Sequence, residues 1–349
     1  MQGFLDRLLA HERYFITTHL RPDGDAIGSQ LALARFLTKL GKHVTLINAD
    51  PPPDALAWLP GVDAVEVFDG SIRQRELIDA ADAVVIVDTN ALDRVGKVGA
   101  AVKAARGTSY LIDHHTSPEA WFDAALSVDT ASSTGELVYG LIEAHDPGLI
   151  DTPLAEALYT AIMTDTGSFR FASVTPRVHR IVADLLERGK LSPAPIHVAL
   201  YDTRRLGALR LLARALETIT LAHEGQVATM TLSLRLMRAS DAHSDETEGF
   251  VNYALSIGGV KAAVIFLETA AGVKMSFRSK GDTYVHEWAR HFGGGGHRNA
   301  SGAFVTKPLE RLIHEVIDVA PRYLAFGGEG TPPDDADLLA MLKQKFHAT

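Results

Sequence analysis

Two adjacent histidines and an aspartate follow a short apolar run, and this arrangement constrains the fold more than any other part of the chain. Asp113-His114-His115 comes directly after the apolar residues 109–112. Ionisable side chains are unfavourable in a hydrophobic core, but carboxylate and imidazole groups are common metal ligands. Other residues of the same kind that follow apolar runs are His19, Asp23, Asp25, Asp88 and Asp165.

The first half of the chain alternates between short β-branched, apolar runs and helical patterns. This alternation predicts an α/β fold, in which an N-terminal parallel sheet is flanked by helices on both faces. Ligands of such sheets bind beyond the carboxyl ends of the strands, where the strand-end aspartates and histidines would then meet. We predict strands over residues 14–18, 43–48, 83–87 and 109–112, and helices over 26–40, 71–80 and 98–105.

The second half of the chain has a different pattern of apolar and polar residues, which predicts a smaller C-terminal α+β domain. The proline-containing stretch 190–195 is typical of a linker, and alternating strands separated by a helix follow it. Further helices are predicted over 136–144, 154–164, 178–187 and 247–256, and further strands over 226–234, 261–267 and 272–277. The predicted divisions are a first domain over 1–189, a linker over 190–204, a second domain over 205–325, and a tail over 326–349 with a short helix at 336–346.

Composition excludes several kinds of site and partner. The 349-residue chain has no cysteine, which excludes disulfides and thiolate zinc sites. Its net charge of -9 argues against long duplex nucleic acid, because such partners require a basic surface. No apolar run approaches the ~18 residues that a membrane span needs, and residues 1–7 do not begin a signal peptide. We therefore expect a cytoplasmic protein without membrane contact.

The spacing His19-x3-Asp23-x-Asp25 puts three candidate ligands on one strand-to-helix loop. Gly24 is expected to permit a tight turn there, and the N–H groups of the following helix start favour an anion. Two cations beside an anion site suit phosphate chemistry, because a metal pair clamps the attacking and leaving oxygens. Mixed carboxylate and imidazole ligands suit Mn²⁺ better than Mg²⁺ alone or a structural zinc. The carboxylates that would balance two divalent ions are those of Asp23, Asp25, Asp88 and Asp165.

Each of these residues also has a structural explanation when it is taken alone. An aspartate at a strand end is often a turn residue or a helix cap, and Asp165 can merely end a helix. A single His19 can be a satisfied, partly buried residue, and a pair of histidines can be a surface accident. The structural explanation is weakest for the whole set, because successive strand ends would have to carry such residues independently.

Two further segments have both a structural and a substrate-binding interpretation. Ser133, with Glu136 three residues later, fits a capping box, but a hydroxyl-lined helix start can also contact a substrate phosphate. The glycines at 293–296 can be only a loop, or they can bring backbone N–H groups close to a phosphate. Neighbouring arginines favour the second interpretation, because a guanidinium can bind phosphate through two hydrogen bonds. The candidate substrate-binding residues are Ser132, Ser133, Arg278, Ser279, Gly295, Gly296, His297 and Arg298.

The chain resembles the DHH phosphoesterase family in its DHH–DHHA1 form, over roughly residues 10–325. The segments similar to the four motifs of the DHH domain are His19-x3-Asp-Gly-Asp-Ala-Ile-Gly-Ser29, Asp88, Asp113-His114-His115, and Asp165 in Thr-Asp-Thr-Gly-Ser-Phe. The glycine-rich segment that ends at His297, together with Ala300 and Gly302, is similar to the DHHA1 signature. Ser301 stands where an alanine is common, and we expect little effect from this small residue.

The resemblance implies roles for the candidate residues. Two Mn²⁺ ions, or Mg²⁺ or Co²⁺ in their place, would share Asp88 as a bridging ligand. Asp113 would orient a histidine, and His115 would act near the scissile phosphate as an acid or an electrostatic stabiliser. The DHHA1 residues Arg278, Ser279, His297 and Arg298 would hold the nucleotide across a cleft between the domains. The remaining ligands would be His19 and Asp23 for one ion, and Asp25, His114 and Asp165 for the other.

The resemblance also implies a hydrolase that acts on short oligonucleotides and on adenosine 3′,5′-bisphosphate by a two-metal mechanism. A phosphodiesterase of cyclic or linear dinucleotides, such as cyclic di-AMP, shares every motif and is the alternative. A single-strand DNA exonuclease is less favoured, because those chains are longer and this one is acidic. A nucleotide-binding regulator that does not catalyse is a candidate from a different class, and a homodimer is left open.

Overall fold

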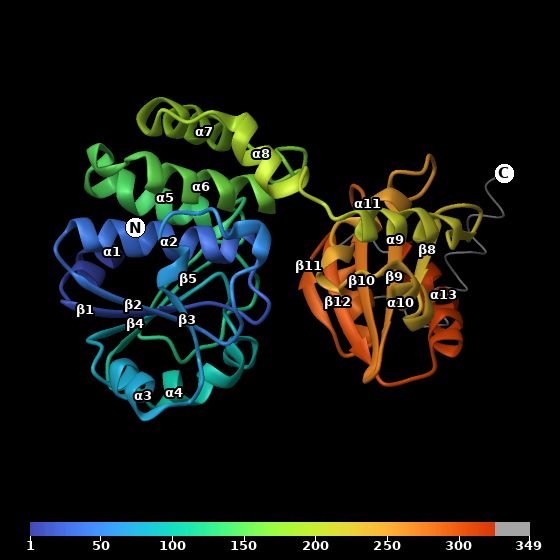
Figure 1. Cartoon of the computed structure of the whole chain (residues 1–349), viewed down its shortest axis with the longest axis horizontal. Helices are drawn as coiled ribbons and strands as arrows, with labels where there is room; N and C mark the ends of the chain where they lie inside the picture. The colour runs from blue at the N-terminus through green and yellow to red at the C-terminus, as the bar shows by residue number, and fades with distance from the viewer. Residues whose placement is uncertain (325–349) are drawn as a thin grey trace. The chain divides into compact units, whose positions relative to one another are not determined.

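The computed structural model describes residues 1–324, in two compact units that meet in the chain between Thr203 and Arg204 (Figure 1). The predicted tail over 326–349, with its helix at 336–346, lies outside the described residues. The segment 190–204, expected to be a linker, contains helix α8 (Pro193–Tyr201). Proline is favoured at a first helical position because the N–H that it lacks would be unpaired there. No helix among residues 1–324 is long and apolar enough to cross a bilayer.

The first unit is built on a six-stranded sheet in which every pair of neighbouring strands is parallel. The strand order is β3-β2-β1-β4-β5-β6. The predicted α/β class is therefore confirmed, and the two short edge strands are additions that the sequence patterns did not predict. The strands are β1 (Arg13–Thr17), β2 (His43–Asn48), β3 (Val65–Val67), β4 (Ala83–Val87), β5 (Thr108–Asp113) and β6 (Ala124–Ser127).

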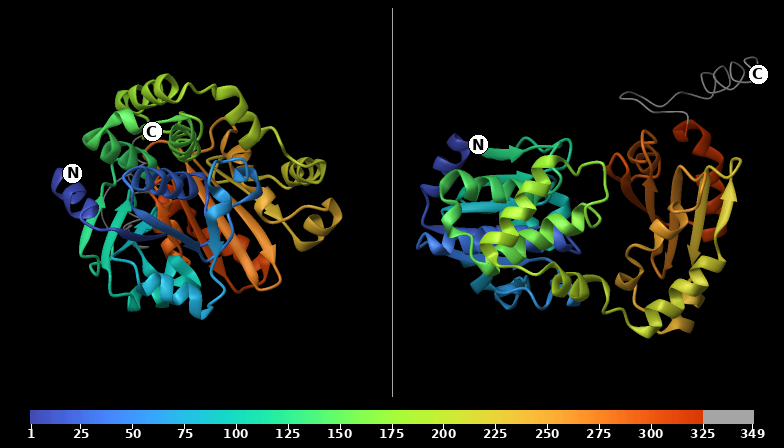
Figure 2. Two further views of the ribbon diagram at one scale, coloured as in Figure 1. Left: turned by 60° about the vertical axis from the view of Figure 1, so that its left-hand side comes forward. Right: turned by 90° about the horizontal axis from the view of Figure 1, so that it is seen from above.

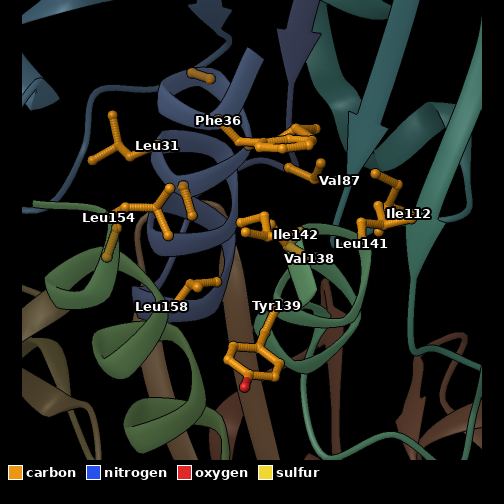
Figure 3. Close-up of a cluster of buried hydrophobic side chains, with 14 of the residues drawn as sticks. Leu31, Phe36, Val87, Ile112, Val138, Tyr139, Leu141, Ile142, Leu154 and Leu158 are labelled. Carbon is orange, nitrogen blue, oxygen red and sulfur yellow. The ribbon is translucent and has the colours of Figure 1, made fainter. Parts of the chain in front are cut away.

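Helices cover both faces of this sheet, as Figure 1 shows. Alternate strand residues supply the two cores, so that Val85 and Val87 face one layer while Val84 and Ile86 face the other. The larger core lies between the sheet and helices α2, α5 and α6 (Figure 3). The helices of that layer are α1 (Gln2–Leu9), α2 (Gly24–Lys39), α5 (Thr134–His145), α6 (Thr152–Asp165) and α7 (Pro176–Gly189), and those of the opposite layer are α3 (Ile72–Asp79) and α4 (Gly99–Ala104).

Three glycines let α2, α5 and α6 approach one another closely. A Cβ added to Gly28 would lie 2.4 Å from the Ala157 carbonyl oxygen, and one added to Gly135 would lie 2.6 Å from the Ala161 Cβ. A Cβ on Gly24 would lie 2.5 Å from the Thr164 hydroxyl. Gly24 is the first residue of α2 and has no positive φ, so the prediction of a tight turn at this glycine is wrong. Its small size matters because the end of α6 packs against it.

The second unit contains a mixed six-stranded sheet of order β11-β12-β10-β9-β8-β7, with helices on both faces (Figure 2). Only β8 and β9 are parallel. This confirms the predicted smaller α+β domain. Its strands are β7 (Thr220–Ala222), β8 (Val227–Leu232), β9 (Ala262–Thr269), β10 (Gly272–Ser279), β11 (Gly295–His297) and β12 (Ala300–Val305). One face carries α9 (Leu206–Glu217), α10 (Leu234–Ser240) and α11 (Phe250–Leu255), and the other carries α12 (His286–His291) and α13 (Leu309–Leu324).

The glycine run 293–296 ends in an edge strand rather than lying wholly in a loop. Gly295 pairs with Gly302 and Gly296 with Ser301, so that β11 lies against β12. A Cβ added to Gly294 would lie 2.0 Å from the Gly302 carbonyl oxygen. The glycines therefore permit close contact between two segments of backbone, which is a structural use for part of the run.

The close packing of α2 on α6 predicts that Gly28→Ala destabilises the first unit. The added methyl group would collide with the backbone at Ala157, and overpacking of this kind costs roughly 1–3 kcal/mol. Urea unfolding followed by circular dichroism measures the loss. Gly3→Ala is the matched control, because nothing lies within 4 Å of a Cβ added there. It should be neutral or slightly stabilising, since alanine favours a helix, and equal losses in the two variants would contradict the packing argument.

Candidate metal centre

The carboxyl ends of three neighbouring strands bring the candidate ligands together. Strands β1, β4 and β5 are adjacent and parallel, so their ends meet at one edge of the sheet. His19 follows β1, Asp88 follows β4 and His114 follows β5. Asp25 lies in the first turn of α2 and Asp165 is the last residue of α6. Residues from distant parts of the chain therefore converge at the edge where the sequence predicted a site.

Asp88 lies between two histidines. Its Oδ2 is 3.4 Å from His19 Nε2, and its Oδ1 is 3.5 Å from His114 Nε2. Each carboxylate oxygen therefore faces a different imidazole. This arrangement allows one carboxylate to contribute to two cation sites at once.

Other carboxylates complete two groups of ligand atoms around these histidines. Asp23 Oδ1 is 4.0 Å from His19 Nε2. Asp25 Oδ2 and Asp165 Oδ2 are 3.7 and 3.3 Å from His114 Nε2. In each group, one ligand atom per residue lies within 4.8 Å of the others. The groups of this kind among the described residues are His19 with Asp23 and Asp88, Asp25 with His114 and Asp165, and Asp88 with His114 and His115.

These separations fit a divalent cation. Two ligands that each lie about 2.1 Å from one ion are about 3.0–3.5 Å apart at octahedral or tetrahedral angles. The distances from His19 to Asp88 and from His114 to Asp165, 3.4 and 3.3 Å, fall in that range. A charged hydrogen bond between the same groups would be shorter, at about 2.7–2.9 Å. The residues present therefore suit a metal ion.

Both histidines turn the same ring nitrogen toward the carboxylates. His19 Nδ1 is 2.8 Å from the Leu20 carbonyl oxygen, and His114 Nδ1 is 3.3 Å from the Ala131 carbonyl oxygen. A carbonyl oxygen accepts a hydrogen bond, so Nδ1 donates and Nε2 keeps the lone pair that a cation requires. The backbone thus selects the tautomer that can bind metal.

Asp25 and Asp88 are buried carboxyl groups whose basic neighbours are histidines. They are 1% and 2% exposed, and within residues 1–324 no lysine or arginine lies at ion-pair distance from either. Burial and the neighbouring carboxylates raise the pKa of Asp88 well above its ordinary value, and burial also raises the pKa of Asp25. Burial alone would lower the pKa of His114, but Asp165 and Asp25 outweigh it and raise that pKa. A bound cation would replace these protons.

His115 is paired with Asp113. Its Nδ1 is 2.7 Å from Asp113 Oδ1, and its backbone N–H donates to Asp113 Oδ2 at 3.0 Å. Burial lowers the pKa of the His115 imidazole, and the bond to Asp113 opposes that effect. Asp113 is fully buried, so it fixes the orientation of the ring. His115 also belongs to a group with Asp88 and His114, so its position suits a ligand as well as a proton donor.

The backbone at Asp88 adopts a left-handed conformation with φ of 59°. This region is unfavourable for residues other than glycine, although aspartate and asparagine tolerate it best. The Asp88 N–H donates to the Ile112 carbonyl oxygen of the neighbouring strand at 3.0 Å. The end of β4 is therefore held in an uncommon conformation at the residue that faces both histidines.

The start of helix α5 supports the aspartates, and sequence reasoning missed this contact. The Thr134 N–H donates to Asp25 Oδ2 at 2.7 Å, and the Gly135 N–H donates to Asp25 Oδ1 at 2.9 Å. The Ser29 hydroxyl donates to Asp25 Oδ1 at 3.0 Å, and the Thr134 hydroxyl donates to Asp88 Oδ1 at 2.9 Å. A threonine and a glycine directly after a predicted helix cap were the only signal in the sequence.

The two helix starts that were expected to face a substrate anion are used within the protein. Asp23 caps α2, because its carboxylate accepts from the Asp25 and Ala26 N–H groups. The predicted cap at Ser133 is present, since its hydroxyl accepts from the Glu136 N–H. The Glu136 carboxylate accepts instead from the N–H of Ser132. The predicted contact of Ser132 and Ser133 with a substrate stays a prediction.

Predicted substrate-binding residues of the second unit lie at one end of its sheet. Arg278 on β10 and His297 on β11 both stand opposite Ala300 of β12. Arg298 is exposed, and its guanidinium lies 5.5 Å from the ring centre of Tyr284. Their predicted role in binding a substrate stays a prediction.

Ser279 has structural partners. Its buried hydroxyl donates to the Thr283 carbonyl oxygen and accepts from the Asn299 amide at 2.9 Å. These bonds tie together the segments that follow β10 and precede β12. A hydroxyl with both partners has little capacity left for a substrate, although the predicted role itself is untested.

Comparisons with known proteins agree with this fold. The chain matches the family model described as the DHH family, N-terminal domain, over residues 13–162, and the DHHA1 domain model over residues 224–325. It is 33% identical to the bifunctional oligoribonuclease and PAP phosphatase NrnA of Thermus thermophilus, over 90% of this chain and 91% of that relative. It is 25% identical to the cyclic-di-AMP phosphodiesterase PdeA of Listeria monocytogenes, over 85% of this chain and 45% of that relative. The solved structure of an exopolyphosphatase-related protein from Bacteroides fragilis has a TM-score of 0.86 and 32% identity, and the match covers 91% of this chain and 96% of that one.

The fold, together with these matches, defines a phosphoesterase, a hydrolase of ester bonds. The chain belongs to the DHH family, in the form that also carries a DHHA1 domain. The resemblance seen in the motifs is thereby confirmed, and so is the prediction of an enzyme. The roles of individual residues stay predictions.

The raised pKa values of Asp25 and Asp88 predict that metal-free protein loses stability as the pH rises. Between the ordinary carboxyl pKa of ~3.9 and the higher folded-state pKa, the folded protein holds more protons than the unfolded chain, so ionisation favours unfolding. We expect a lower melting temperature at about pH 8 than at about pH 5.5 in chelator, and a smaller difference in Asp88→Asn. Added Mn²⁺ should restore the wild-type value at the higher pH. Equal pH dependence in both proteins would contradict the buried charge on Asp88.

The hydroxyl of Thr134 predicts a measurable effect on metal affinity. Thr134→Val removes the donor to Asp88 but keeps the shape of the side chain, and loss of such a supporting bond weakens metal binding by about 10–100-fold. Thr134→Ser keeps the hydroxyl and should restore most of the affinity. Calorimetric titration of metal-free protein with Mn²⁺ measures both, and an unchanged affinity in Thr134→Val would rule out this supporting role.

Proposed function

We propose that the chain hydrolyses short oligonucleotides and removes the 3′-phosphate of adenosine 3′,5′-bisphosphate, with two Mn²⁺ ions as cofactors. Mg²⁺ or Co²⁺ are candidate replacements. The observation that carries the proposal is Asp88, whose two oxygens face different histidines at 3.4 and 3.5 Å. The relative named as an oligoribonuclease and PAP phosphatase supports the substrate class, because it aligns with 90% of this chain.

The two groups of ligand atoms assign a set of residues to each cation. Carboxylates with imidazoles favour Mn²⁺ among the available divalent ions. When bound, the pair of cations would stabilise charge on the attacking and leaving oxygens of the phosphate. The proposed ligands are His19, Asp23 and Asp88 for one ion, and Asp25, Asp88, His114 and Asp165 for the other.

His115 and Asp113 are proposed to manage a proton during hydrolysis. Asp113 accepts from Nδ1 of the His115 ring, so Nε2 is the atom that can hold a proton for the leaving oxygen. Asp113 also opposes the lowering of the His115 pKa by burial. Asp113 thus fixes the ring and favours its protonated form, which could donate a proton and would also stabilise negative charge on the phosphate.

The second unit is proposed to bind the nucleotide. Arg278 and Arg298 supply guanidinium groups, which suit a phosphate, and His297 lies on β11, which β12 separates from the Arg278 strand. Gly295 and Gly296 leave that edge of the sheet without bulky side chains. The net charge of -9 favours short substrates over long duplexes. Cytoplasmic location belongs to this proposal, because short RNA fragments arise there, and a homodimer stays a prediction.

A cyclic-di-AMP phosphodiesterase is the second candidate. The PdeA relative favours it, because it aligns with 85% of this chain. The chain spans only 45% of that relative, so the likeness concerns a part of a longer protein. Cyclic dinucleotide is therefore included as a competing substrate in the test of function.

Competition among substrates tests the proposal. With Mn²⁺ present, we expect diadenylate and adenosine 3′,5′-bisphosphate to be hydrolysed faster than cyclic di-AMP when all three are offered together. Asp88→Asn should lower kcat by at least about 10²–10³-fold while the circular dichroism spectrum is unchanged, because the shared ligand is lost. Chromatography of the released nucleotides measures each rate.

Asp82→Asn is the matched control, because Asp82 precedes β4 whereas Asp88 follows it. Asp82 forms a surface ion pair with Arg13 at 2.8 Å, and such pairs contribute little. This variant should keep wild-type turnover. Binding of all three nucleotides without any product would favour the non-catalytic regulator, and substantial activity in Asp88→Asn would contradict the shared-ligand role.

A further inference from the structure

A strained loop begins directly after the candidate ligand Asp165. Gly167, Ser168 and Phe169 have φ values of 56°, 60° and 65°, so three consecutive residues are left-handed. Such a conformation is unfavourable for serine and phenylalanine. A loop of this kind persists only where its surroundings hold it, and strained backbone gathers at binding sites.

Two phenylalanines of this loop differ in their contacts and exposure. Phe169 packs inward, with its ring centre 5.8 Å from that of Tyr159 and 6.2 Å from that of His179. Phe171 is 40% exposed, and the tip of its ring lies over Gly167, where an added Cβ would be 2.5 Å from Cζ. The loop therefore packs one partly buried aromatic ring against the core as an anchor and presents the other to solvent.

The exposed ring is held close to the metal centre. The N–H groups of Arg170 and Phe171 both donate to the Thr166 carbonyl oxygen, at 3.1 and 3.2 Å. Thr166 is the residue after Asp165, and Gly167, on which the ring rests, is two residues away. Two peptide units span at most about 7.6 Å between Cα atoms. The Asp165 carboxylate and the Phe171 ring are thus close enough for a single nucleotide to contact both.

A cation lies beside the same ring. The Arg170 guanidinium carbon is 5.6 Å from the centre of the Phe171 ring, and the arginine side chain is exposed. An aromatic face with a neighbouring guanidinium is a recurring way to hold an unpaired nucleobase beside its phosphate. Neither residue is needed to fill the core.

We propose that Phe171 is a stacking platform for a nucleobase of the substrate, with Arg170 beside it to attract the attached phosphate. The ligand class is a nucleotide whose phosphate lies at the metal centre. This inference rests on the proposed function, because it presumes that the scissile phosphate belongs to a nucleotide. It adds a recognition element on the first unit to the residues proposed on the second.

Binding of a nucleotide and of the same molecule without its base tests this proposal. Calorimetry with saturating Mn²⁺ would compare adenosine 5′-monophosphate with ribose 5-phosphate, for wild type, Phe171→Ala and Phe171→Trp. Stacking on one aromatic ring is worth ~1–3 kcal/mol per base. We therefore expect Phe171→Ala to weaken the nucleotide by about tenfold, to leave ribose 5-phosphate unchanged, and to be rescued by the larger ring of tryptophan.

Phe304→Ala is the matched control. Phe304 is 52% exposed and its ring also lies against a glycine, Gly272, but it is at the far end of β12 from Ala300. This variant should bind both ligands like wild type. For diadenylate, Phe171→Ala should raise KM by about tenfold with a much smaller change in kcat.

The outcomes separate this proposal from the proposed function. Equal losses for both ligands in Phe171→Ala, no loss for either, or a wild type that binds the nucleotide no better than ribose 5-phosphate would each overturn the stacking role. If wild type prefers the nucleotide through Phe171 but hydrolyses neither diadenylate nor the bisphosphate, the proposed function fails while the stacking role stands.

Discussion

The structure depends on one buried carboxylate that is shared between two imidazoles. Asp88 is 2% exposed, and its oxygens face His19 and His114 at 3.4 and 3.5 Å. Burying a charge without a lysine or arginine to balance it is unfavourable. The folded chain can hold this group either as a protonated acid or as the ligand of cations. In the second state each histidine would bind through Nε2, because its Nδ1 faces a backbone carbonyl oxygen.

The packing that builds the core also places the ligands. Glycines bring α2, α5 and α6 close enough for the start of α5 to donate to Asp25. The Thr134 hydroxyl links this helix to Asp88, so one helix start holds two candidate ligands. Hydrogen bonds from fixed N–H groups reduce the cost of the buried anions. Stability of the helical layer and geometry of the metal centre are therefore set by the same contacts.

The sequence predicted the sheet edge because strand ends are a local property of the chain. Asp88 and His114 follow apolar runs, and parallel strands bring such ends together. The contacts of Thr134 and Gly135 with Asp25 join residues about a hundred positions apart, and no local pattern marks them. The prediction of a tight turn at Gly24 was wrong for a similar reason. The side chain that makes a small residue necessary there belongs to Thr164, which is distant in the sequence. In the second unit, strand β11 escaped notice because glycine has a low strand propensity.

Crystals soaked with Mn²⁺ and measured at its absorption edge test the central claim most directly. The account predicts two anomalous peaks in each chain, ~3.5–4 Å apart, on opposite sides of the Asp88 carboxylate. One peak should adjoin His19 and the other should adjoin His114. A single peak that leaves one histidine without metal, or peaks that do not touch Asp88, would contradict it.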